Sequence, residues 1–376
     1  MIYFDNNATT RMAPEVRDAL RPFLDEHYAN PSSPYTFARG TSIALADARE
    51  HVAALLGVTP NEITFTSGGS ESINAVFHAA LTSQPERRHL IITAVEHAAT
   101  MQCAQRAEQA GARVTRLAVD DAGRLDMDAY RAALTDDTAL VSVMAANNET
   151  GVLFPVDAMA ARAAERGVLF HCDATQAVGK MPFRADSPGM TFVSISGHKL
   201  HAPKGIGALV VRRGTRLPPF IVGGDQEQGR RAGTENVIGI VGLGAAAQLA
   251  QGAPALFEER IRPLREKLEA RIRADIKGVQ VAGADAPRLP NTSMLLFEGL
   301  HAEVMLARLD MEGICCSSGS ACASGATEPS HVLSAMGFPP NHAFGAVRIS
   351  FSRYTSPDEV ETFMDRLLSI IHSMRR

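Results

Sequence analysis

Short apolar runs alternate with longer amphipathic segments through the first two thirds of the chain. The runs predict strands, and several segments between them carry apolar residues at helical spacing. The predicted strands cover residues 62–66, 90–94, 139–145, 168–172, 192–195 and 208–211, and the predicted helices cover residues 71–81, 98–109 and 158–165. This alternation predicts an α/β fold with a mainly parallel sheet and helices on both faces. Ligands of such sheets bind beyond the carboxyl ends of the strands.

The pattern changes after Gln251-Gly252-Ala253-Pro254. A strongly charged helix is predicted over residues 257–276, then strands over 293–297 and 347–351 and helices over 303–309 and 357–371. We expect a smaller α+β lobe here, with the residues before Pro14 folded against it. The predicted domains are therefore a large domain of residues 14–253 and a small domain of residues 1–13 with 254–376.

Composition limits the class of protein and the kind of partner. The 376 residues are 45% apolar and 21% charged, as in globular proteins large enough for a main domain and a second lobe. A net charge of −4 without a basic block argues against nucleic acid as a partner. No apolar run approaches the ~20 residues of a membrane span, and no signal-peptide pattern is present, so we expect a cytoplasmic protein. Five irregularly spaced cysteines favour neither a disulfide framework nor a zinc site.

A glycine-rich turn joins the first predicted strand to its helix, in Thr66-Ser67-Gly68-Gly69-Ser70. Glycine lets a ligand approach the backbone closely, and a helix N-terminus offers N–H groups to an anion. Gly69 and Ser70 are therefore candidate phosphate contacts. A turn that only caps the helix would have the same pattern.

Three later strands end in side chains that suit pyridoxal phosphate (PLP). Lys199 follows an apolar strand in Ser196-Gly197-His198-Lys199, where its amine could hold the PLP aldehyde, with Ser196 and His198 near the phosphate. Asp173 follows another buried strand and would keep the pyridine nitrogen of PLP protonated, while Gln176 could donate to the ring hydroxyl. His97 follows a third strand and could stack on the ring and move protons. A helix cap is the alternative for Asp173, and a cap or core position is the alternative for His97.

A small-residue segment, Ser317-Ser318-Gly319-Ser320-Ala321-Cys322, supplies a candidate nucleophile. Together with the PLP pattern, Cys322 predicts sulfur chemistry on an amino acid. A simple turn with an incidental thiol is the alternative.

The motifs resemble those of cysteine desulfurases of the NifS/IscS type, which are PLP enzymes related to class-V aminotransferases and have fold type I with a seven-stranded sheet. The resemblance spans nearly the whole chain and leans toward the NifS side. It rests on residues 3–10, Asn30-Pro31-Ser32-Ser33, Val95-Glu96-His97, Ala146-Asn147-Asn148-Glu149-Thr150-Gly151, residues 196–205, Arg231-Ala232-Gly233-Thr234-Glu235-Asn236, the cysteine segment and residues 350–355. Two departures are Ser70, where relatives often carry Thr, and a chain that stops at Arg376, which leaves scaffold docking open.

The resemblance implies a role for each matching residue. Lys199 would carry PLP as a Schiff base, with Asp173 on the ring nitrogen, Gln176 on the ring hydroxyl and His97 over the ring. The implied phosphate contacts are Gly69, Ser70, Ser196, His198 and, from the neighbouring subunit of a homodimer, Thr234. The implied substrate contacts are Asn7, Asn148 and Arg348.

The resemblance also implies the reaction. L-cysteine would give alanine and a persulfide on Cys322, whose sulfur passes to an iron–sulfur scaffold or another acceptor protein. No resident metal is expected, apart from an iron–sulfur species held transiently on Cys322. Nitrogenase maturation, general iron–sulfur assembly and tRNA thiolation all remain candidate pathways. The alternatives are a selenocysteine lyase or other PLP lyase, an aminotransferase, and a PLP-free scaffold or sulfur-relay protein.

Overall fold

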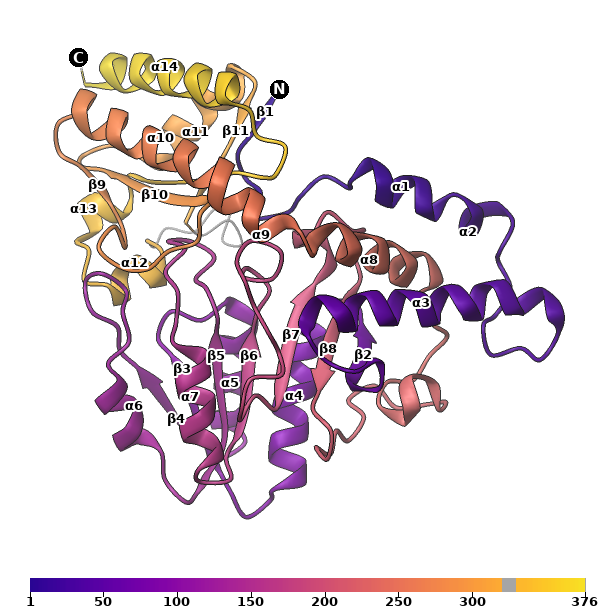
Figure 1. The fold of residues 1–376 in the computed structure, drawn as a ribbon. Coiled ribbons are helices and arrows are strands. Elements are labelled where there is room, and N and C mark those ends of the chain that lie inside the picture. The colour runs from indigo at the N-terminus through magenta and orange to yellow at the C-terminus, as the bar shows by residue number, and fades with distance from the viewer. Residues whose placement is uncertain (320–328, 376) are drawn as a thin grey trace.

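The computed structural model of the chain describes residues 1–319 and 329–375. A seven-stranded sheet in the order β2-β8-β7-β6-β5-β3-β4 forms the centre of the larger body (Figure 1). Strand β8 runs antiparallel to both of its neighbours, and the other pairings are parallel, which confirms the mainly parallel α/β fold. The strands are β2 (Ile63–Thr66), β3 (His89–Thr93), β4 (Arg113–Leu117), β5 (Thr138–Met144), β6 (Leu169–Asp173), β7 (Phe192–Ser196) and β8 (Gly207–Val211).

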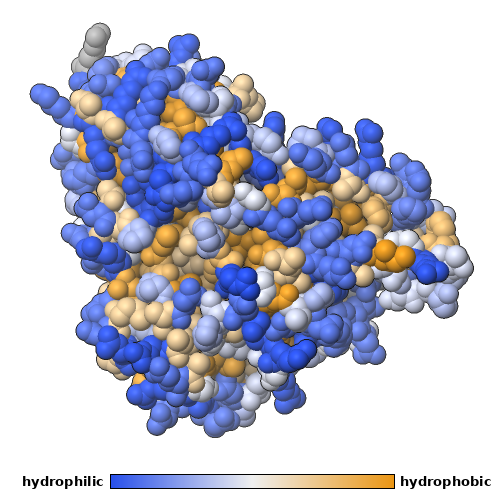
Figure 2. Space-filling view, viewed as in Figure 1, coloured by the Kyte–Doolittle hydropathy of each residue, from blue (hydrophilic) through white to orange (hydrophobic). Residues whose placement is uncertain are grey.

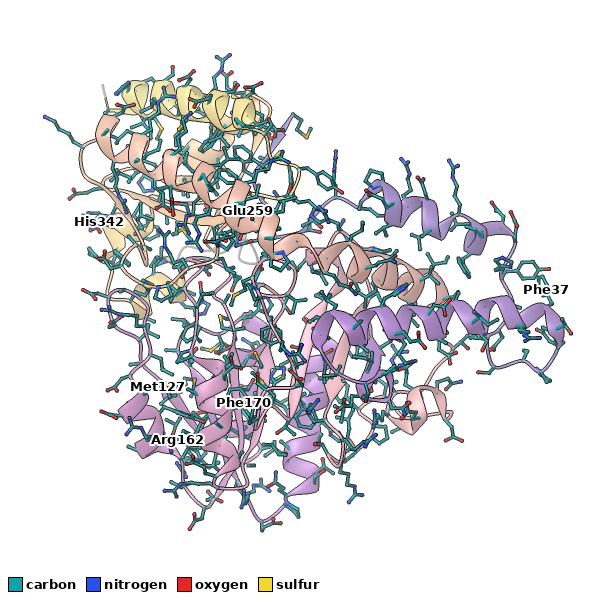
Figure 3. All side chains as sticks on the ribbon, viewed as in Figure 1. Phe37, Met127, Arg162, Phe170, Glu259 and His342 are labelled. Atoms are coloured by element: carbon teal, nitrogen blue, oxygen red, sulfur yellow. The ribbon has the colours of Figure 1, made fainter. Side chains whose placement is uncertain are left out.

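Helices cover both faces of this sheet. Successive strand residues point to opposite faces, so Leu90 packs with Phe77 of α4 while Ile91 belongs to the cluster that holds Met159 of α7. Phe170, which Figure 3 labels near the middle of the sheet, is fully buried in that second cluster. The helices around the sheet are α4 (Gly69–Ser83), α5 (Ala98–Gln109), α6 (Met127–Ala133) and α7 (Val156–Ala164), and three further helices at its side are α1 (Pro14–Leu20), α3 (Arg39–Leu56) and α8 (Val237–Ala250).

Strand β4 is absent from the predicted elements. It lies at the edge of the sheet, and its sequence Arg-Val-Thr-Arg-Leu places two charged side chains in five residues. An edge strand tolerates exposed charges, so its apolar signal is weak. Strand β4 is therefore hard to predict from an apolar run.

The smaller lobe at the top of Figure 1 has its own sheet and its own buried cluster. Four antiparallel strands in the order β12-β13-β10-β9 lie beneath helices, and β1 of the N-terminus pairs with β11. Phe4 packs edge-on against Phe351 and Phe363, so the N-terminal segment joins this lobe. The domain limits at residues 13 and 253 stay a prediction. The elements of the lobe are β1 (Ile2–Tyr3), β9 (Val279–Val281), β10 (Thr292–Phe297), β11 (Ile314–Cys315), β12 (Ser317–Ser318), β13 (Ala346–Ser350), α10 (Arg262–Asp275), α11 (Ala302–Met311), α12 (His331–Ala335), α13 (Pro340–Ala343) and α14 (Pro357–Met374).

The charged helix predicted over residues 257–276 is interrupted. A π-helical turn over Phe257–Ile261 precedes α10, after the short helix α9 (Ala253–Leu256). Pro263 lies in the first turn of α10 and has no N–H to donate to a carbonyl four residues earlier. A wider turn at this point is the expected consequence.

Helices α1, α2 (Pro22–Asp25), α3 and α8 project from the body as an arm (Figure 1). Small residues let α3 and α8 approach closely, since a Cβ on Gly244 would lie 2.5 Å from Ala48 Cα. No single helix among the described residues is long and apolar enough to span a bilayer. The pair Val237–Ala250 and Ala253–Asp275 passes that test together and is bent by 56°.

Candidate active site

A cavity of about 450 Å³ lies beyond the carboxyl ends of β5, β6 and β7. Segments more than 300 residues apart in the sequence line it together. The predicted site residues that line it are Asn7, Gly69, Ser70, His97, Asn148, Asp173, Gln176, Ser196, His198, Lys199 and Arg348. The structure thus brings together all the predicted site residues except Thr234 and Cys322.

One side of the cavity, which we call the sheet wall, consists of Asp173, Ser196, His198 and Lys199. Asp173 is the last residue of β6, Ser196 the last of β7, and Lys199 ends the 3₁₀ turn Gly197–Lys199 that follows. Since β6 and β7 are parallel neighbours, their ends bring these side chains to one edge of the sheet. The Asp173 carboxylate accepts a hydrogen bond from the backbone N–H of Thr175 at 3.0 Å.

Another side, which we call the N-terminal wall, consists of Asn7, Ala8 and Arg348. Arg348 is fully buried in β13 and pairs with Asp5 Oδ1 at 2.7 Å. Its Nη1 donates to the backbone oxygen of Asn148 at 3.2 Å, and its Nε has no hydrogen-bond partner among the described residues. A buried guanidinium N–H without an acceptor suits a bound carboxylate.

The two walls are joined by the amine of Lys199. Its Nζ donates to the backbone oxygens of Asn7 at 2.5 Å and Ala8 at 2.7 Å. The Lys199 amine of the sheet wall is thereby held against the backbone of the N-terminal wall.

The glycine-rich turn forms an anion cradle at the N-terminus of α4. Gly68 has φ +149°, which favours glycine, and a Cβ on Gly69 would lie 3.3 Å from Thr175 Oγ1. Among the described residues Thr175 Oγ1 is buried without a hydrogen-bond partner, and Thr175 lines the cavity. A bound phosphate would supply the missing acceptor for this hydroxyl as well as for the helix N–H groups.

Two histidines at the cavity are held in their neutral form. Burial, with a further contribution from the Lys199 cation, lowers the pKa of His198 to about 4. Burial also lowers the pKa of His97, whose Nδ1 accepts a hydrogen bond from the backbone N–H of Ala99. In neutral His97 the proton therefore lies on Nε2, the ring nitrogen left to interact with a ligand.

The structure adds buried carboxylic acids that sequence reasoning passed over. Burial raises the pKa of Glu96 to about 8 and that of Glu149 to about 7. Glu149 lines the cavity and accepts a hydrogen bond from Ser330 at 2.5 Å, and a Cβ on Gly319 would lie 2.5 Å from its Oε2. Both residues stand in motifs already recognised, Val-Glu-His and Asn-Asn-Glu-Thr-Gly. The missing signal was their burial, which a sequence motif does not report.

His331, Thr175 and Lys180 were also passed over. His331 lines the cavity, and its Nε2 donates to the backbone oxygen of Glu96 at 3.0 Å. Lys180 is buried four residues after Gln176 in a turn that is otherwise apolar, and a lone lysine in such a segment is the signal that could have revealed it.

Two predicted residues do not line this cavity. Thr234 is exposed, and the segment before it is tied to α4 by an ion pair of 3.0 Å between Arg231 and Glu71. Cys322 lies outside the described residues.

The residues present fit PLP. In the cavity, the Lys199 amine suits the aldehyde of PLP and the Asp173 carboxylate suits its pyridinium nitrogen. The anion cradle, with Thr175, suits its phosphate. Among the described residues, no group of three or more His, Cys, Asp or Glu side chains could hold a metal ion.

Comparisons with known proteins agree with this geometry. The profile of the class-V aminotransferases matches residues 2–363. The chain is 48% identical over all its length to a cysteine desulfurase of Trichormus azollae and 49% identical to one of Klebsiella pneumoniae, each match covering 94% of the relative. A solved NifS-like protein superimposes with a TM-score of 0.92 at 34% identity, covering 99% of both chains. The chain therefore belongs to the class-V aminotransferases, whose cysteine desulfurase members use PLP, and within them to the cysteine desulfurases of the NifS type.

Proposed function

We propose that this protein is a PLP-dependent cysteine desulfurase that takes the sulfur of L-cysteine onto Cys322 and delivers it for iron–sulfur cluster assembly. The observation that carries the proposal is a single cavity in which Lys199, Asp173 and His97 face the substrate-binding pair Asn148 and Arg348. Relatives 48–49% identical to the whole chain carry the name cysteine desulfurase.

The residues divide the work between binding and proton transfer. Bound PLP supplies an electron sink for chemistry at the substrate α-carbon. Arg348, with its unpaired Nε, and Asn148 bind the substrate carboxylate. The Lys199 amine takes the α-proton and returns it, and Nε2–H of His97 donates to the bound molecule.

Sulfur transfer is assigned to Cys322. Its thiolate attacks the substrate sulfur, an S–S bond forms, and the Cβ–S bond breaks. The electron pair of the broken bond stays on the carbon, which is protonated to alanine, so cysteine and one thiol give alanine and one persulfide. The chain supports this assignment because Gly319 lines the cavity, and three residues of chain reach at most ~11 Å.

The proposal includes a homodimer that works in the cytoplasm. Large apolar side chains are exposed on the arm, among them Tyr28, Tyr35, Phe37 and Ile43. Figure 2 shows apolar residues gathered over this arm, and Figure 3 places Phe37 at its outer end. A second copy would cover this surface and bring its Thr234 to the phosphate cradle. Sedimentation of the double variant Tyr35→Glu, Phe37→Glu as a monomer would support this arrangement.

The test of function compares the native enzyme with Cys322→Ala. Loaded with PLP and given L-cysteine and a reductant, the native enzyme is expected to form alanine and sulfide, and the variant is expected to lose this activity. Cys316→Ala is the matched control, because burial raises the pKa of the Cys316 thiol well above its usual value and keeps it from acting as a thiolate. Full activity of Cys322→Ala would contradict the proposed function and indicate another PLP lyase, such as a selenocysteine lyase.

The sulfur acceptor is tested separately. An iron–sulfur scaffold protein added to the persulfide form should take up the sulfur and build a cluster when iron is supplied. Transfer to a tRNA-modifying protein alone would redirect the proposal to thiolation.

A further inference from the structure

A buried lysine next to the cofactor residues has no part in the reaction described above. Lys180 is only 4% exposed, and none of the ion pairs among the described residues joins it to a carboxylate. The charged groups that act on it are the cations of Lys199 and Arg348, and these, with burial as the largest cause, lower the pKa of Lys180 well below its usual value. A buried amine beside two cations costs free energy, so its hydrogen bonds need an explanation.

Both hydrogen bonds of Lys180 go to side-chain amide oxygens. Its Nζ lies 2.5 Å from Gln176 Oε1 and 3.1 Å from Asn7 Oδ1. An ammonium has three N–H groups and a neutral amine has two, so either form supplies a donor for each oxygen.

One backbone carbonyl and the amine of Lys180 together hold the Gln176 amide in one orientation. Gln176 Nε2 donates to the backbone oxygen of Asn7 at 3.0 Å. A carbonyl only accepts, so the amide nitrogen must face Asn7 and the amide oxygen must face Lys180. The amide has a second N–H, which has no acceptor among the described residues, and Gln176 lines the cavity.

The Asn7 amide is fixed in the same way. Its Nδ2 donates to the backbone oxygen of Asn148 at 3.1 Å and to Thr292 Oγ1 at 2.9 Å. Its Oδ1 accepts from Lys180 and from Asn291 Nδ2 at 3.2 Å. Asn7 therefore keeps one donor if Lys180 is removed, whereas Gln176 Oε1 keeps none among the described residues. The consequence of losing Lys180 falls mainly on Gln176.

We propose that Lys180 is a positioning residue for the cofactor: by donating to Gln176 Oε1, it holds the second amide N–H of Gln176 toward the PLP ring. The proposal rests on the proposed function, since it assigns that N–H to the ring oxygen. A donor at the ring oxygen stabilises negative charge there and so weakens the hold of the neighbouring Schiff-base nitrogen on its proton. Without Lys180 the Gln176 amide rotates to find another donor for its oxygen, and the ring loses this hydrogen bond.

The experiment follows the visible absorbance of bound PLP as a function of pH in the loaded enzyme. Lys180→Met keeps the length of the side chain and removes the donor. The pH midpoint of the band is expected to rise by about one pH unit or more, the equivalent of one hydrogen bond to a charged group. Gln176→Met should raise the midpoint by a similar amount.

The double variant separates positioning from a direct effect of charge. If Lys180 acts through Gln176, adding Lys180→Met to Gln176→Met gives no further shift. If the Lys180 cation acts directly on the cofactor, the shift persists in the Gln176→Met background, which would overturn the proposal. An unchanged midpoint in Lys180→Met would overturn it as well.

Controls cover folding and the underlying function. Val178→Ala removes buried methyl groups from the same turn and should leave the midpoint unchanged. If Lys180→Met does not fold, Lys180→Gln keeps an N–H donor for Gln176 Oε1 and should shift the midpoint less than Gln176→Met does, and a shift as large as that of Gln176→Met would refute the proposal. A native enzyme that shows no visible band with PLP would refute the proposed function itself, which is a distinguishable result.

Discussion

The sheet wall and the N-terminal wall present similar polar groups to one cavity, but they are built differently. In the sheet wall, Asp173 and Lys199 each stand within a few residues of a buried strand whose backbone pairing fixes their place. In the N-terminal wall, Asn7 reaches its position through side-chain bonds to Asn148, Thr292 and Lys180. The first wall depends on local sequence and strand ladders, and the second depends on a network across distant segments.

The difference suggests how each wall responds to mutation. A substitution in the sheet wall removes one chemical group from a frame that other residues hold. A substitution in the N-terminal wall removes a partner from several others, because the amide nitrogen and the amide oxygen of Asn7 each make two hydrogen bonds. Loss of chemistry is expected on one side and loss of binding and stability on the other.

The largest effect is expected from Lys199→Ala in the sheet wall. Removing the amine that moves the α-proton should lower kcat by ~10²- to 10⁴-fold. The unfolding free energy should fall by only about 1 kcal/mol, because β7 and its ladder remain and Asn7 O keeps the Gln176 donor, while Ala8 O loses the Lys199 donor. Steady-state kinetics and urea unfolding of the same preparation check both statements, and a kcat within tenfold of the native value would contradict the role of Lys199.

The next effect is expected at Gly151, which lies beside Thr292, a hydrogen-bond partner of Asn7 in the N-terminal wall. The φ of Gly151 is +77°, and a Cβ there would lie 2.9 Å from the Cβ of Thr292, whose hydroxyl accepts from Asn7. Backbone strain and overpacking together should destabilise Gly151→Ala by ~2–5 kcal/mol. The matched control is Gly167→Ala, with φ +60° and open space around the Cβ, which should cost only ~1–2 kcal/mol. Equal losses of unfolding free energy in the two variants, measured in urea, would show that the contact with Thr292 does not contribute to the destabilisation.

Arg348→Ala tests substrate binding by the N-terminal wall. Loss of a charged hydrogen bond to the substrate carboxylate should raise KM for L-cysteine by ~10- to 100-fold, with a smaller change in kcat. Arg116→Ala, which removes an ion pair with Glu108 on the surface, should leave KM unchanged. A fall in kcat with an unchanged KM would contradict a role of Arg348 in substrate binding and assign it to catalysis.

The smallest effect concerns Glu149, the buried acid that lines the cavity. Burial raises its pKa from 4.5 to about 7, so the folded state binds a proton that the unfolded state releases. Stability from this group is full below the unfolded pKa and is lost as the pH rises through the folded pKa. Between about pH 6 and about pH 7 the native protein should lose ~1 kcal/mol of stability through this group. Glu149→Gln should lack this loss, while the exposed Glu165→Gln should retain it, as urea unfolding at several pH values can measure.

Sequence reasoning located six of the seven strands of the central sheet and the residues that follow them. Strand β6 was expected over residues 168–172 and lies at Leu169–Asp173, and α5 has the expected bounds. These elements were predictable because apolar periodicity reports burial directly. Strand β4 and the π-turn before α10 were not, because edge exposure and a single proline alter the pattern locally.

By itself the sequence brought together the candidate PLP residues of the sheet wall, whose roles stay predictions, because a strand end and the motif after it are neighbours along the chain. It also determined the presence of Cys322, whose role stays a prediction. Only the tertiary structure decided that Arg348 pairs with Asp5, that burial raises the pKa of Glu149, and that Lys180 donates a hydrogen bond to the Gln176 amide oxygen. These contacts depend on which segments of the two lobes meet and on the burial of the groups between them, and neither quantity is written in the spacing of residues along one chain.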